Sequence, residues 1–74
     1  MKSTQLIIDE LDTEALVARN MATAESLHLS MALRDGNDVL AEELLGNIVK
    51  NVQDMGKYAR QKRIVMKEAF AANR

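Results

Sequence analysis

The chain contains no cysteine, no proline and no tryptophan, and it has one histidine, one tyrosine and one phenylalanine in 74 residues. Without cysteine it forms neither a disulfide nor a thiolate metal site, and a single histidine, His28, excludes a histidine-based metal cluster. The scarcity of aromatic residues disfavours a β-sandwich or a barrel. A chain this short buries too little surface to be comfortably stable alone, so oligomerisation is the remaining route to extra stability.

Long hydrophobic runs are also missing, since the longest are far short of the ~20 residues that cross a bilayer. The opening residues MKSTQLIIDELDTE turn acidic at once, where a secretory signal has a longer apolar core. No nucleophile with its base, paired carboxylate set or glycine-rich phosphate loop stands out. We therefore expect a soluble cytoplasmic protein that is not an enzyme, takes no cofactor or metal and does not bind membranes.

Strong helix formers fill the sequence, and one break interrupts them. The break is RDGND, residues 34–38, where Gly36 suits the left-handed end of one helix and Asn37 or Asp38 can cap the next. The pattern predicts one domain over residues 1–74, with helix one at about 4–34, a turn at 35–38 and helix two at about 39–71. An alternative start for helix one at Asp12 or Thr13 would leave QLIIDEL as a separate segment.

Helix two carries apolar residues at alternating spacings of four and three from Ala41 onward, which is typical of helices that pack along their length. The residues of this seam are Leu45, Ile48, Val52, Met55, Ala59, Lys62, Met66 and Ala69. Leu44, Tyr58 and Val65 widen the stripe on one side, and Val49 and Phe70 widen it on the other. A stripe this broad indicates more than one neighbouring helix.

Helix one has two apolar rows of its own. The first is rich in alanine and comprises Ile8, Leu11, Ala15, Ala18, Ala22, Glu25, Leu29 and Ala32; the second comprises Val17, Met21, Ala24, His28 and Met31. A lone hairpin would leave the second row in water, so we expect two hairpins, each of two antiparallel helices, to pair as a homodimeric four-helix bundle, with the relative direction of the hairpins left open by the sequence. The residues expected in the core or dimer interface are Leu45, Ile48, Val52, Met55, Ala59, Met66, Met21 and Leu29.

Three polar residues interrupt these rows. Lys62 either pairs with Glu10 or Glu14 across the hairpin or packs its stem while its ammonium group stays in water. Glu25 lies at the level of Asn47 and Lys50 and either forms an ion pair between the helices there or contributes to a polar crossing between subunits. His28 is either a half-buried histidine with a hydrogen bond or a pH-sensitive group.

Positive charge is concentrated near the C-terminus. Residues 1–56 hold ten acidic and four basic residues, whereas residues 57–74 hold six basic residues and one acidic residue. Lys57, Arg60, Arg63, Lys67 and Arg74 form a basic stripe on the outer face of helix two. The stripe is a candidate surface for a partner or for phosphate contacts. It is alternatively a solvated face that pairs with Asp9, Glu10 and Asp12. Without a helix-turn-helix or an aromatic platform, sequence-specific nucleic-acid binding is disfavoured.

The opening MKSTQLIIDELDTEALVARN and the closing RQKRIVMKEAF, in a small helical chain without cysteine or proline, resemble the small all-helical accessory proteins encoded in the early regions of lambdoid phages. The resemblance covers the whole chain in general character and carries over no functional residue. It implies a non-catalytic protein that binds host or phage regulatory machinery. We therefore expect a homodimeric adaptor or regulatory accessory protein, with non-specific nucleic-acid binding by the basic stripe as the alternative.

Overall fold

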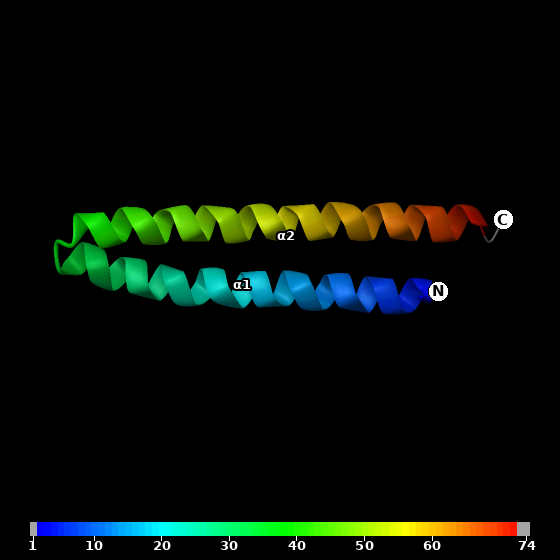
Figure 1. The fold of residues 1–74 in the computed structure, drawn as a ribbon, viewed down its shortest axis with the longest axis horizontal. Helices are drawn as coiled ribbons and strands as arrows, with labels where there is room; N and C mark the ends of the chain where they lie inside the picture. The colour runs from blue at the N-terminus through cyan, green and yellow to red at the C-terminus, as the bar shows by residue number, and fades with distance from the viewer. Residues whose placement is uncertain (1, 73–74) are drawn as a thin grey trace.

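A computed structural model describes residues 2–72, which form two long helices joined by a tight turn. Helix α1 runs over Thr4–Arg34 and helix α2 over Asp38–Ala72. The helices lie side by side and antiparallel, so both ends of the chain are at the same end of the rod (Figure 1). The described chain measures 58 × 16 × 14 Å. The expected all-α helical hairpin is confirmed.

Helix α1 is continuous from its first turn. The Ser3 hydroxyl oxygen accepts a hydrogen bond from the Leu6 amide at 3.1 Å, so Ser3 is the N-cap. The Thr13 hydroxyl donates to the Asp9 carbonyl at 2.9 Å within the helix. Thr13 therefore does not cap a second start, and the segment QLIIDEL belongs to α1.

The turn closes both helix ends with backbone and side-chain hydrogen bonds. Gly36 has φ of 70°. The Gly36 amide donates to the Leu33 carbonyl at 3.2 Å, and the Asn37 amide donates to the Ala32 carbonyl at 2.8 Å. This is the Schellman arrangement that ends a helix at a left-handed glycine. The Asn37 side-chain oxygen then accepts from the Leu40 amide at 3.2 Å and caps α2.

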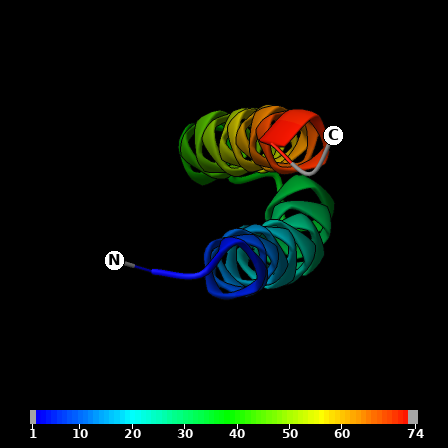
Figure 2. The ribbon, with the colours of Figure 1, turned by 90° about the vertical axis from the view of Figure 1, so that its right-hand side faces the viewer.

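The two helices pack along heptad-spaced rows, and in the end-on view they wrap around one another (Figure 2). The α1 row is the alanine-rich one predicted from the sequence. The buried and half-buried residues of α2 that form the opposite row are Ala41, Leu44, Ile48, Asn51, Met55, Tyr58, Lys62, Val65 and Ala69. Every second position of the row predicted for α2 is confirmed as a contact with α1. At the positions between them, the residue one place earlier in the sequence makes the contact. These residues are Leu44, Asn51, Tyr58 and Val65, in place of Leu45, Val52, Ala59 and Met66.

The core between the helices is thin. The buried apolar residues of the described chain are Ala18, Ala32, Ala41 and Leu44, and no side chain is fully buried. The hairpin exposes 5852 Å², whereas a compact monomer of similar mass exposes about 4,600 Å². The excess, about 1,300 Å² for one chain, is larger than the ~800 Å² that each partner buries in a standard specific interface.

Candidate interaction surfaces

A buried amide anchors the middle of the helix–helix seam. Asn51 is 9% exposed, and its side-chain nitrogen donates to the Glu25 carboxylate across the seam. The prediction that Glu25 pairs at the level of Asn47 and Lys50 is wrong by one residue, because Asn51 and not Lys50 points into the contact. A hydrogen bond between two seam positions favours one register of the helices over those that separate the pair.

Lys62 reaches across the same seam nearer the chain ends. Its ammonium group lies 2.8 Å from the Asp12 carboxylate, with 37% of the lysine side chain and 53% of the aspartate side chain exposed. The predicted partners Glu10 and Glu14 are wrong; Glu10 instead pairs with Lys2 at 2.9 Å. Since both members are well solvated, the contact contributes little to stability.

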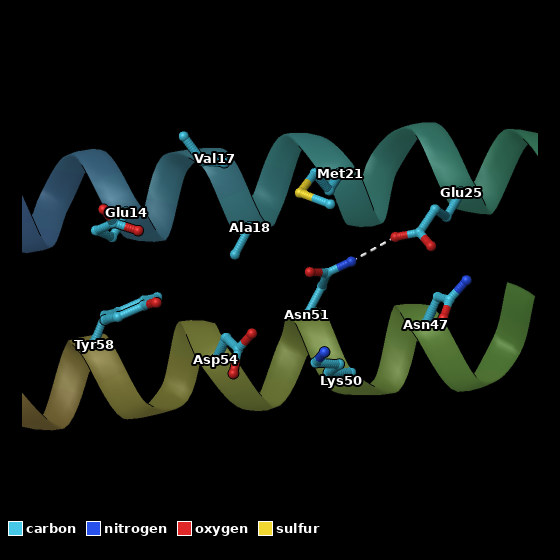
Figure 3. A pocket seen from close by; sticks show the side chains of 10 residues that line it. All are labelled: Glu14, Val17, Ala18, Met21, Glu25, Asn47, Lys50, Asn51, Asp54 and Tyr58. Carbon is cyan, nitrogen blue, oxygen red and sulfur yellow. Dashed lines mark hydrogen bonds between the residues drawn. The ribbon is translucent and has the colours of Figure 1, made fainter.

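A groove of about 420 Å³ runs between the helices on one face of the hairpin. Ala18 and Asn51 point into the space between the helices (Figure 3), and Val17 and Met21 are the further apolar residues of α1 that line the groove. Three carboxylates, those of Glu14, Glu25 and Asp54, line it together with one lysine, Lys50. The groove therefore combines an apolar wall with net negative charge.

The outer row of α1 extends this groove toward the turn. Its members are the second row predicted from the sequence: Val17, Met21, Ala24, His28 and Met31. Each is exposed, and Met21 and Met31 are each about half in solvent, at 52% and 51%. His28 and Met31 also border a smaller hollow of about 210 Å³ beside Leu40. His28 is exposed rather than half-buried, and no side-chain hydrogen bond joins it to residues 2–72.

The outer row of α2 is longer and lacks any covering element within the described chain. It follows the spacing 4-3-4-3-4-3 through Leu45, Val49, Val52, Gly56, Ala59, Arg63 and Met66, and Phe70 occupies the next position. Leu45, Val52 and Met66 are 51%, 53% and 51% exposed. Four of the residues expected in the core or dimer interface (Leu45, Val52, Ala59 and Met66) lie here, whereas Ile48, Met55 and Leu29 lie in the seam between the helices.

The two outer rows lie on opposite faces of the hairpin. Val17 and Met21 share their face with Lys50 and Asp54 of α2, since all four line the groove. Successive residues of a helix turn by about 100°. Val52 therefore points nearly opposite to Lys50, away from the groove.

The basic stripe is exposed where the structure describes it. Lys57, Arg60, Arg63 and Lys67 are exposed, and none forms an ion pair or side-chain hydrogen bond within the described chain; Arg74 lies outside the described residues. The acids expected to pair with the stripe are engaged elsewhere. Asp12 binds Lys62, Glu10 binds Lys2, and Asp9 accepts from Gln5 at 2.9 Å.

Neither described helix is long and apolar enough to cross a membrane. Within residues 2–72 there is no group of three or more histidine, cysteine, aspartate or glutamate side chains placed to hold a metal ion. In comparisons with known proteins, no family model, curated protein or solved structure matches the chain.

Proposed function

We propose that the protein is a non-catalytic cytoplasmic homodimer that acts as a protein-binding adaptor or regulatory accessory protein. The observation that carries the proposal is the pair of uncovered apolar rows on opposite faces of the hairpin. Contiguous apolar surface of this kind marks interaction sites in water-exposed proteins.

Symmetry explains why two opposite rows favour an adaptor over a simple dimer. A two-fold axis pairs the same patch on both copies. One such contact covers one face of each hairpin, so the apolar row on the other face stays available. The dimer thus keeps two equivalent apolar surfaces for a second protein, and the thin core explains why the pairing is needed for stability.

The partner class follows from the sequence resemblance. The resemblance to small helical accessory proteins of phage early regions implies binding to regulatory proteins of the phage or host. We therefore propose a regulatory protein as the partner.

Solution mass and a dye that fluoresces on apolar surface test the adaptor proposal together. We expect light scattering to give a dimer and that dimer to bind the dye anilinonaphthalene sulfonate. The variant Met21→Glu/Met31→Glu should remain dimeric and lose most of the dye signal. The matched control Thr23→Glu/Ser30→Glu adds the same charge to exposed polar positions of α1 and should keep it. A monomeric chain, or a dimer that binds no dye, would contradict the proposal.

Non-specific nucleic-acid binding is the second candidate, and the unpaired state of Lys57, Arg60 and Lys67 favours it. Phosphate contacts by such a stripe weaken steeply as salt rises. The test is retention of a short DNA duplex at low and high salt, with charge reversal at these three positions. Arg63 stays unchanged because it lies within the apolar outer row. Binding at low salt that the reversal abolishes supports this candidate; absence of binding at low salt excludes it.

A further inference from the structure

We propose that two copies pair through the outer row of α2, with the two α2 helices antiparallel and the two-fold axis passing between Gly56 and Ala59. This rests on the proposed homodimer and specifies its interface. The row is the longer of the two, spanning about 32 Å from Leu45 to Met66 at 1.5 Å per residue.

The outer row of α2 has its two smallest residues at its middle and bulky apolar residues at both ends. With the axis between Gly56 and Ala59, these two small residues meet at the centre, where helices approach most closely. Val52 then faces Arg63 of the second copy, and Val49 faces Met66. At the ends Leu45 meets the level of Phe70, so bulky apolar side chains close the contact on both sides.

Charge favours the antiparallel direction. Residues 38–54 of α2 hold four acidic residues and one lysine, whereas residues 57–72 hold five basic residues and one glutamate. Antiparallel pairing sets the acidic half of each α2 against the basic half of the other. Parallel pairing would place five basic side chains beside their own copies, which is unfavourable.

The same axis brings the two α1 helices together on the face away from the groove. The Asn51–Glu25 and Lys62–Asp12 contacts place the level of Gly56 and Ala59 opposite residues 15–19 of α1. The residues that turn toward the second copy there are Ile8, Asp12, Ala15, Arg19, Ala22 and Ser26. Half of them are alanine or serine, and Arg19 lies about one helical turn from the level of Asp12 of the second copy. The four helices then form a square bundle.

In this dimer the groove and the outer row of α1 remain exposed to solvent. The groove and the outer row of α1 point outward on both sides of the bundle, because they lie opposite the paired face. The adaptor surface of the dimer is therefore the acidic groove with Val17 and Met21 at its wall.

Single-cysteine variants test the register, because the natural chain has no cysteine to give background disulfides. Val52→Cys and Arg63→Cys are unfolded together, refolded as a mixture and oxidised. We expect a disulfide-linked dimer in the mixture and none from either variant alone, since a disulfide needs Cα atoms about 4.4–6.8 Å apart. The control mixture of Leu45→Cys with Arg63→Cys should stay unlinked, because these positions lie two helical turns out of register.

The other possible results distinguish a wrong interface from the absence of a homodimer. Linking of Val52→Cys to itself means parallel pairing or an antiparallel pairing centred on Val52, and linking of Met21→Cys to itself means pairing through α1. Each result overturns this inference and leaves the homodimer standing. A natural chain with the mass of a monomer overturns the homodimer itself. Light scattering on each unoxidised variant shows whether the substitution has changed the assembly before the disulfide is read.

Discussion

At the scale of single residues, Asn51 is the buried polar residue of the described chain. It lies in the row that packs on α1, and its amide reaches Glu25 of that helix. A buried hydrogen bond contributes about 1 kcal/mol on balance, and leaving one partner unsatisfied costs about 1–3 kcal/mol. The pair therefore contributes more to choosing a register than to total stability.

Removal of this amide should destabilise the fold measurably. We expect Asn51→Ala to lower the free energy of unfolding by about 1–2 kcal/mol in urea titrations followed by circular dichroism, because Glu25 loses its donor and a small cavity opens. The control Gln53→Ala lies on the exposed face of α2 and should change stability by less than about 0.5 kcal/mol. Equal effects of the two substitutions would show that the Asn51–Glu25 contact is not formed.

Replacement of Lys62, unlike that of Asn51, should stabilise the hairpin. The ion pair of this lysine with Asp12 is solvated and screened by salt, whereas its position in the seam suits an apolar side chain. Lys62→Met should therefore raise the midpoint of thermal unfolding, by the equivalent of up to about 1 kcal/mol. A midpoint that falls, and falls more at low salt than at high salt, would mean that the ion pair matters more than the exposure of its members suggests.

Asn51 also explains which part of the packing sequence reasoning missed. Apolar residues at heptad spacing favour the register through Leu45, Val52 and Met66, because the true row contains an amide at Asn51, whereas Lys62 interrupts both registers equally. The amide is tolerated in the seam because Glu25 sits opposite it, a pairing that depends on the relative level of two helices. The axial position of one helix relative to the other is set by their packing, and the sequence pattern of a single helix does not reveal it.

At the scale of elements, the turn decides the fold. Gly36 takes a left-handed conformation that other residues adopt only with strain, and the Ala32, Leu33 and Asn37 backbone groups complete the cap. The helices on both sides follow from helix-forming composition and the absence of proline. The turn and the α1 row were therefore predictable from local sequence, since each depends on residues close together in the chain.

Two glycines separate the effect of the turn from that of helix propensity. Gly36→Ala should cost about 1–2 kcal/mol of unfolding free energy, because alanine is strained at φ of 70°. Gly46→Ala should instead stabilise the protein by about 0.5–1 kcal/mol, since a Cβ atom there meets nothing within 4 Å and alanine favours the helix. Urea titration of both variants checks the pair; a stabilising Gly36→Ala would contradict the described turn.

At the scale of the whole molecule, the decisive feature is the placement of the two outer rows on opposite faces. From the sequence we expected one four-helix bundle to bury both rows. The faces are set by how α1 and α2 rotate against each other, and this rotation follows from the true α2 register. In the proposed dimer, one interface covers the α2 row and the α1 row stays exposed beside the groove.

Charge placed on each row should distinguish their roles. Val49→Glu introduces a carboxylate opposite Met66 of the second copy in the proposed interface, and we expect it to weaken dimerisation at least tenfold in sedimentation experiments, because a charge without a partner is costly to bury. Met21→Glu carries the same added charge on the opposite face and should leave the dimerisation constant nearly unchanged. Dissociation caused by Met21→Glu alone would place the interface on α1 instead.

The measurement that tests the central claim most directly is the solution mass of the unmodified chain by light scattering over a range of concentrations. The chain has a mass of 8.3 kDa, and we expect twice that value at concentrations in the micromolar range. A mass that stays at that of one chain throughout would contradict the homodimer and leave both apolar rows to a different protein.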